Sequence, residues 1–110
     1  YYMMYSANFF GGQYYAVGYA VSGNPLGPFR KAENNPVLQK NTDKGGDVSG
    51  TGHNMILTLP DGQMYCVYHG RTTKTGDERV VFIDQMEIKD NGELVVSGPT
   101  TGEQTIFLKK

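Results

Sequence analysis

Short apolar runs, each ended by a turn of Gly, Pro, Asn or Asp, constrain the fold of this chain more than any other feature. The runs cover residues 1–6, 14–22, 29–32, 54–59, 63–69, 79–88 and 93–97. Between them stand turn sequences such as Pro60-Asp61-Gly62 and Asn91-Gly92, which favour tight reversals of the backbone. No window has a sustained 3.6-residue apolar period. The sequence therefore predicts an all-β, antiparallel chain with almost no helix.

The order of the runs indicates a repeated unit. The second half holds four runs joined by short turns, whereas the first half holds three, as though its opening strand were missing. A four-stranded antiparallel unit repeated every ~40 to 50 residues is typical of a β-propeller blade. A β-sandwich or a jelly roll also has short strands at such spacing, so the strand pattern alone leaves these folds open. The longest connection, residues 34–52, is polar and of a length that is usually functional or disordered.

Composition excludes several classes of protein. The chain has 110 residues, enough for one small domain, and its net charge of −1 provides no basic surface for nucleic acid. No stretch approaches the roughly 20 apolar residues that span a bilayer. The single cysteine, Cys66, excludes an intrachain disulfide and lies in a strand-like run, which predicts a buried, unreactive thiol.

Motifs along nearly the whole chain resemble those of glycoside hydrolase family 43, and they follow in the same order. They are residues 1–8 (YYMMYSAN), 15–20 (YAVGYA), 25–29 (PLGPF), 35–38 (NPVL), 50–54 (GTGHN), 61–69 (DGQMYCVYH), 79–86 (RVVFIDQM) and 98–100 (GPT). The resemblance implies a five-bladed β-propeller enzyme that acts on arabinan, xylan and related plant polysaccharides by an inverting mechanism.

The same resemblance predicts which part of the propeller is present. Residues 1–110 would form one partial domain at its C-terminal side, about two four-stranded blades. Residues 1–45 would be the penultimate blade without its first strand, and residues 46–110 the last blade. The chain opens on a strand-like run without an initiator Met, so we expect a piece of a longer protein, with the rest of the propeller N-terminal to Tyr1.

No residue is predicted to be the catalytic acid or base. By resemblance, two Asp residues lie in earlier blades and a Glu lies a few residues before a strand like residues 1–6, so none has a match here. Asp84 is the unusual carboxylate, because in an extended strand it shares a face with the apolar side chains of residues 80, 82, 86 and 88. Such a group needs partners, so we expect a structural, hydrogen-bonded Asp84. The turn carboxylates Asp61, Asp90 and Glu93 are expected to be solvated.

Four residues are candidates for a site. The resemblance places Arg79 where family members hydrogen-bond the sugar in the cleaved subsite, a role that suits the rigid five-donor guanidinium. Arg71 and Asn8 are weaker candidates for substrate contact. His53 matches the family's Gly-His-Asn motif in the central channel, where members often hold Ca²⁺; water would supply most of the ligands, because Ca²⁺ takes six to eight oxygens.

Two main hypotheses about function remain open. The parent protein is either a glycosidase that hydrolyses arabinose- or xylose-containing side chains, or a non-catalytic carbohydrate-binding propeller. A third possibility is that this chain is only a structural piece with no activity of its own. We expect an extracellular or periplasmic protein with an oligo- or polysaccharide partner, and neither a nucleic-acid nor a membrane partner. A Glu followed by Gly-Pro shortly before Tyr1 would favour the enzyme.

Overall fold

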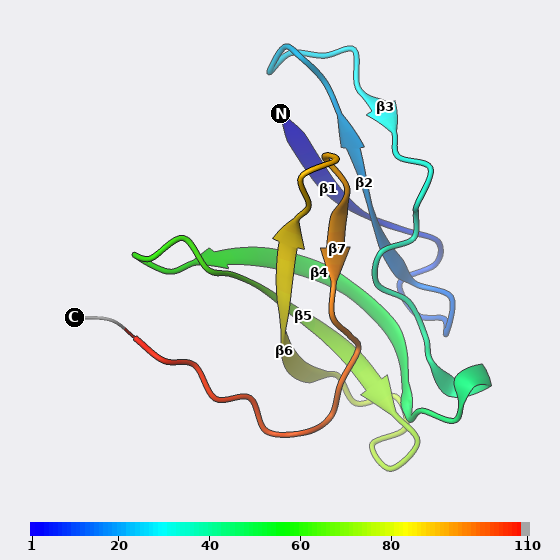
Figure 1. Ribbon diagram of the computed structural model, residues 1–110. Coiled ribbons are helices and arrows are strands. Elements are labelled where there is room, and N and C mark those ends of the chain that lie inside the picture. Colours follow the sequence, from blue (N-terminus) through cyan, green and yellow to red (C-terminus); the bar gives the residue numbers. More distant parts are fainter. Residues whose placement is uncertain (109–110) are drawn as a thin grey trace.

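The computed structural model describes residues 1–108 as two antiparallel sheets (Figure 1). The strands are β1 (Tyr2–Ala7), β2 (Ala16–Val21), β3 (Arg30–Lys31), β4 (Val48–Thr58), β5 (Met64–Thr72), β6 (Val80–Ile88) and β7 (Leu94–Val96). One 3₁₀ turn, η1 (Thr42–Lys44), is the only helix among residues 1–108, and it is too short to cross a membrane. The prediction of an all-β, antiparallel chain is confirmed.

Each sheet follows the order of the sequence. The first sheet has the order β1-β2-β3, and the second has the order β4-β5-β6-β7. Every neighbouring pair is antiparallel, as expected for strands joined by short hairpins. The predicted hairpin turns lie between β4 and β5 and between β6 and β7, where Gly62 and Gly92 have φ of 90° and 89°. Glycine suits both positions because it adopts positive φ without a steric penalty.

The sequence interpretation placed the start of the fourth strand too late. We expected a strand from residue 54 after a long loop, but β4 begins at Val48 and pairs with β5 through Ser49 and Gly52. Register shifts interrupt the pairing on both sides of Gly52, and Gly50 and His53 have φ of 61° and 55°. Such bulges let a glycine-rich segment remain in the sheet, which its polar composition did not indicate.

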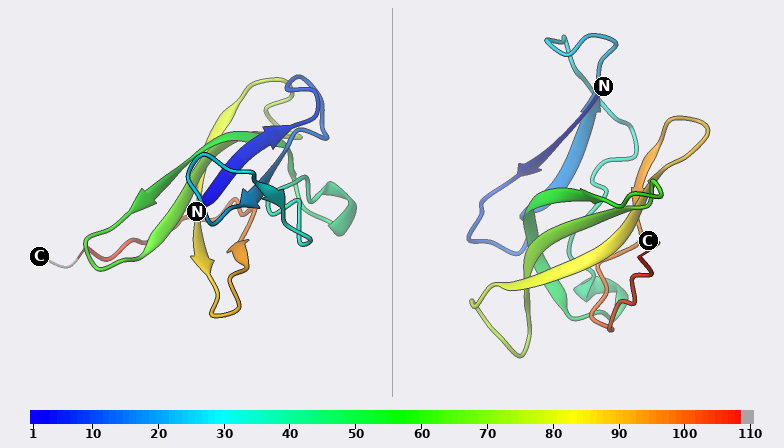
Figure 2. Two further views of the ribbon diagram at one scale, coloured as in Figure 1. Left: turned by 90° about the horizontal axis from the view of Figure 1, so that it is seen from above. Right: turned by 90° about the vertical axis from the view of Figure 1, so that its left-hand side faces the viewer.

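The core lies between the two sheets, which pack face to face (Figure 2). Residues of both sheets and of the connection between them are buried in it, namely Val17, Tyr19, Leu38, Val48, Cys66, Tyr68, Phe82, Met86 and Leu94. The hydroxyl of Tyr19 joins the sheets, because it donates to Asn34 Oδ1 at 2.6 Å and accepts from the backbone N–H of Leu94 at 3.2 Å. The orientation of the sheets is thus fixed by apolar burial and by directed hydrogen bonds.

Cys66 is fully buried in this core, as predicted. Burial raises the pKa of its thiol to about 11, because the thiolate would lose its hydration. The thiol is therefore protonated and unreactive at neutral pH.

Asp84 is a buried structural carboxylate, as predicted, with only 1% of its surface exposed. Its Oδ2 accepts from the Tyr68 hydroxyl at 2.5 Å and from the backbone N–H of Thr100 at 3.1 Å, and its Oδ1 accepts from the Thr100 hydroxyl. This hydrogen bonding raises the pKa of Tyr68 further, in addition to the larger effect of burial. Asp84 thereby holds the segment after β7 against β6.

Replacing Asp84 with Asn should destabilise the fold. The amide nitrogen cannot accept from the Tyr68 hydroxyl or from Thr100, so at least one buried donor is left without a partner. We expect the free energy of unfolding of the full-length protein to fall by about 1–3 kcal/mol, measured by urea denaturation. Asp90→Asn, at an exposed turn, is the control and should change it little. A similar value for the two variants would contradict the structural role of Asp84.

Candidate functional site

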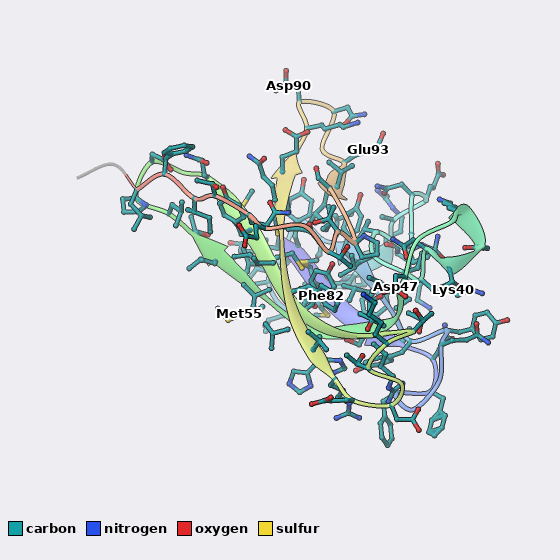
Figure 3. All side chains as sticks on the ribbon, turned by 90° about the horizontal axis from the view of Figure 1, so that it is seen from below. Lys40, Asp47, Met55, Phe82, Asp90 and Glu93 are labelled. Carbon is teal, nitrogen blue, oxygen red and sulfur yellow. The ribbon has the colours of Figure 1, made fainter. Side chains whose placement is uncertain are left out.

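The predicted site residues gather at one end of the two sheets. There the loop between β1 and β2, the start of β4 and the loop between β5 and β6 come together (Figures 2 and 3). Direct contacts confirm the approach of these segments: the Arg71 guanidinium donates to the carbonyl of Phe10, and the His53 backbone N–H donates to Ser6 Oγ at 2.8 Å. The β6–β7 hairpin, with Asp90 and Glu93, lies at the opposite end of the second sheet (Figure 3).

Arg79 lies directly before β6 and is exposed. Its guanidinium carbon stands 5.8 Å from the centre of the Phe10 ring, within the range of a cation–π contact. Within residues 1–108 it makes no hydrogen bond or ion pair, so all five of its donors are available. These donors could therefore bind a ligand.

Arg71, near the end of β5, is used differently. Its Nε donates to the carbonyl of Asp77 at 3.3 Å and its Nη2 to the carbonyl of Phe10 at 3.5 Å. The guanidinium also lies against Gly50, where an added Cβ would come within 3.2 Å of Nη1. Arg71 therefore ties the β1–β2 loop and the β5–β6 loop together beside β4 and has fewer free donors than Arg79.

Asn8 follows β1 with φ of 70°, a conformation that asparagine tolerates better than most residues. Its Nδ2 donates to the carbonyl of Tyr14 at 2.8 Å, which closes the β1–β2 loop. Asn8 also lines a cavity of about 450 Å³ on the first sheet, together with Tyr5, Tyr14, Asn35 and Lys40 among others. Its side-chain oxygen accepts no hydrogen bond from residues 1–108.

Two histidines lie next to each other, one in the middle of β4 and the other near the end of β5. The rings of His53, which is exposed, and His69 are 6.0 Å apart, and the His69 ring stacks on Tyr15 at 5.9 Å. Gly52 makes room for this stack, since any side chain there would overlap the Tyr15 ring. His69 belongs to the motif of residues 61–69, but the sequence did not single it out as a site residue. The sequence could not show that His69 pairs with Gly52 in the β4–β5 register.

Several carboxylates of this chain are occupied by structural hydrogen bonds, whereas Asp77 and Glu78 lie exposed in the β5–β6 loop directly before Arg79. Asp47 accepts from the backbone N–H of Thr73 at 2.9 Å and from the Thr73 hydroxyl, and these bonds lower the pKa of its carboxyl. Asp61 and Glu93 accept hydrogen bonds within their own turns. Asp84 is used inside the core.

A metal would find few protein ligands here. Within residues 1–108 no three His, Cys, Asp or Glu side chains stand close enough to hold an ion. His53 offers nitrogen, whereas calcium prefers oxygen. The described residues therefore do not form a calcium site by themselves.

His69 should remain uncharged at neutral pH. Its Nδ1 is buried and has no hydrogen-bond partner in the described part of the chain. Burial lowers the pKa of the imidazole, and the charges of Arg79, His53 and Arg71 lower it further. The folded state then binds a proton less readily than the unfolded chain, so the free energy of unfolding should fall as the pH drops below about 6.5.

This can be measured by following the His69 imidazole by NMR and by urea unfolding of the full-length protein between about pH 5 and pH 8. His69→Gln should reduce the loss of stability at low pH. A His69 pKa at or above the ordinary histidine value would contradict the assignment.

Comparisons with known proteins identify relatives of this chain. The model of glycosyl hydrolases family 43 matches residues 1–94. A beta-D-galactofuranosidase of Aspergillus niger is 39% identical over 98 residues, which are 86% of this chain and 27% of that protein.

Two solved structures are similar over most of the chain. A thermostable family-43 glycoside hydrolase has 46% identity and a TM-score of 0.82, over 96% of this chain and 34% of that one. An endo-1,4-beta-xylanase of Bacteroides thetaiotaomicron has 35% identity and a TM-score of 0.77, over 90% of this chain and 34% of that one. The chain thus spans about a third or less of these relatives.

These likenesses confirm the predicted fold class, a fragment of an antiparallel β-propeller. They select it over the sandwich and the jelly roll, which the strand pattern had left open. With a family model that matches from Tyr1 into the last strand, this chain belongs to glycosyl hydrolases family 43.

Proposed function

We propose that these residues form part of a glycosidase that hydrolyses O-glycosidic bonds in plant polysaccharide side chains containing arabinose or xylose, by inversion. The family match supports glycoside hydrolysis as the reaction class. The main structural support within this chain comes from Arg79. Its guanidinium is exposed at the end of the β5–β6 loop and makes no hydrogen bond within residues 1–108.

In this proposal, residues 1–110 bind the sugar and transfer no proton. An inverting glycosidase needs two carboxyl groups about 6.5–9.5 Å apart, with a water between one of them and the sugar. Asp61, Asp84 and Asp47 are used in a turn, in the core and on Thr73. As the family resemblance implies, the acid and the base would come from other blades of the propeller, and residues 1–110 alone would be inactive.

The relatives suggest which sugars to test. One is a beta-D-galactofuranosidase and another an endo-1,4-beta-xylanase. A galactofuranoside is therefore a second candidate substrate beside arabinosides and xylosides. The alternative function is a propeller that binds carbohydrate without cleaving it, and hydrolysis of aryl arabinosides, xylosides and galactofuranosides by the full-length protein separates the two. Because polysaccharides of this kind lie outside cells, the proposal includes an extracellular or periplasmic location.

Arg79→Ala in the full-length protein should lower kcat/KM strongly. Charge-assisted hydrogen bonds contribute about 1.5–3 kcal/mol each, so a loss of roughly ten- to several-hundredfold is expected. Arg79→Lys should restore little, because an ammonium group lacks the planar fork. Steady-state kinetics on the best aryl glycoside gives the answer.

Arg30→Ala is the matched control, since Arg30 is exposed on β3, at the other end of the first sheet. It should leave kcat/KM unchanged. If Arg79→Ala retained the parental value as well, Arg79 would be an ordinary surface charge, and Asn8 would be the next candidate.

The proposal keeps His53 as a channel residue beside a hydrated calcium ion. Such an ion would stabilise the native state by mass action, so added Ca²⁺ would raise the thermal midpoint of the full-length protein. His53→Ala should reduce this calcium response and lower activity. A variant that responds to calcium as the parent does would show that His53 does not help to hold an ion.

A further inference from the structure

Phe10 lies between the two arginines of the site and contacts both. Its ring lies beneath the Arg79 guanidinium at 5.8 Å, and its backbone carbonyl accepts from Arg71 Nη2 at 3.5 Å. The two contacts use different parts of the residue: a substitution of the side chain removes the first and leaves the second available.

The β1–β2 loop holds the Phe10 ring in place. The rings of Phe9 and Phe10 meet edge to face, with centres 5.1 Å apart and planes at 71°. Phe9 itself folds back over Gly11, where an added Cβ would come within 2.8 Å of its ring. The backbone N–H of Gly12 donates to the carbonyl of Phe9 at 3.0 Å and closes the turn. Phe10 is thus supported by its own loop, although its side chain is 59% exposed.

Arg79, in contrast, has no other support. It is exposed and makes no hydrogen bond within residues 1–108, so its long side chain has many rotamers of similar energy. An aromatic ring attracts a guanidinium to its face while leaving the in-plane N–H donors free. The ring can therefore fix the plane of the guanidinium without using a donor that a sugar hydroxyl would need.

We propose that Phe10 is a positioning residue, which holds the Arg79 guanidinium in the orientation that binds the sugar. The inference rests on the proposed function, because it takes Arg79 to be a substrate contact. It makes the β1–β2 loop of the first sheet part of a binding site whose arginine comes from the second sheet. Substitutions in this loop should then change how tightly the sugar is held.

A double-mutant cycle in the full-length protein tests this role. Phe10→Leu keeps an apolar side chain but removes the ring, and we expect kcat/KM to fall about twofold to tenfold, the order expected from an exposed cation–π contact and lost orientation. Phe10→Tyr should keep nearly the parental value. In the Arg79→Ala background, Phe10→Leu should cause no further loss.

Tyr1→Leu is the matched control. Tyr1 is an aromatic residue of similar exposure, at 65%, and lies directly before β1 at the other end of the first sheet, away from Arg79. Its replacement should not change kcat/KM. An equal loss with Phe10→Leu in both backgrounds would overturn the positioning role and indicate that Phe10 contacts the sugar itself. No loss in either background would overturn it as well.

A second measurement does not depend on activity. The Nε–H resonance of Arg79 in the full-length protein should carry a ring-current shift from Phe10, and Phe10→Leu should abolish that shift while leaving the Arg71 resonance in place. An Arg79 resonance that does not move would overturn the proposal. If the parent protein hydrolyses no glycoside but the shift is present, the proposed function fails and the contact between Phe10 and Arg79 stands.

Discussion

The face-to-face packing of the two sheets determines where every other part of this chain lies. Each sheet covers apolar side chains of the other, and this packing removes them from water. Tyr19 and Val17 from the first sheet meet Tyr68 and Leu94 from the second in a single core. The Tyr19 hydroxyl adds direction to this contact, since it bonds to Asn34 and to the backbone of Leu94. Apolar burial supplies most of the stability, and the hydrogen bonds select one orientation.

The same packing brings the site loops together. β4 contacts both β1 and β2, and the buried Thr51 hydroxyl of β4 donates to the carbonyl of Leu38 at 3.2 Å. Ser6 at the end of β1 then meets the backbone of His53. The loops that carry Phe10 and Arg79 extend from the same end of neighbouring sheets. Phe10 and Arg79, nearly 70 positions apart in the sequence, therefore contact each other because the packed sheets bring their loops together. This is common in sites built on loops over a rigid scaffold.

The sequence correctly predicted the features that depend on the local pattern of apolar and polar residues. The alternation along residues 80–88 correctly predicted that Asp84 faces the core, and the apolar surroundings of Cys66 correctly predicted its burial. The start of β4 was wrong because bulges let the glycine-rich segment from residue 48 onward pair with β5, and a bulge has no period that can be counted. The pairing of Phe10 with Arg79 could not be predicted either, since it depends on how two sheets pack and neither residue has a local signal for the other.

A crystal structure of the full-length protein with a pentose or galactofuranose product bound would test the account most directly. The account predicts that the sugar lies at the end of the sheets where the β1–β2 and β5–β6 loops meet. An Arg79 nitrogen should stand about 3 Å from a sugar hydroxyl, with the Phe10 ring against the guanidinium. A sugar held elsewhere on the protein by other residues, with Arg79 pointing into solvent, would contradict it.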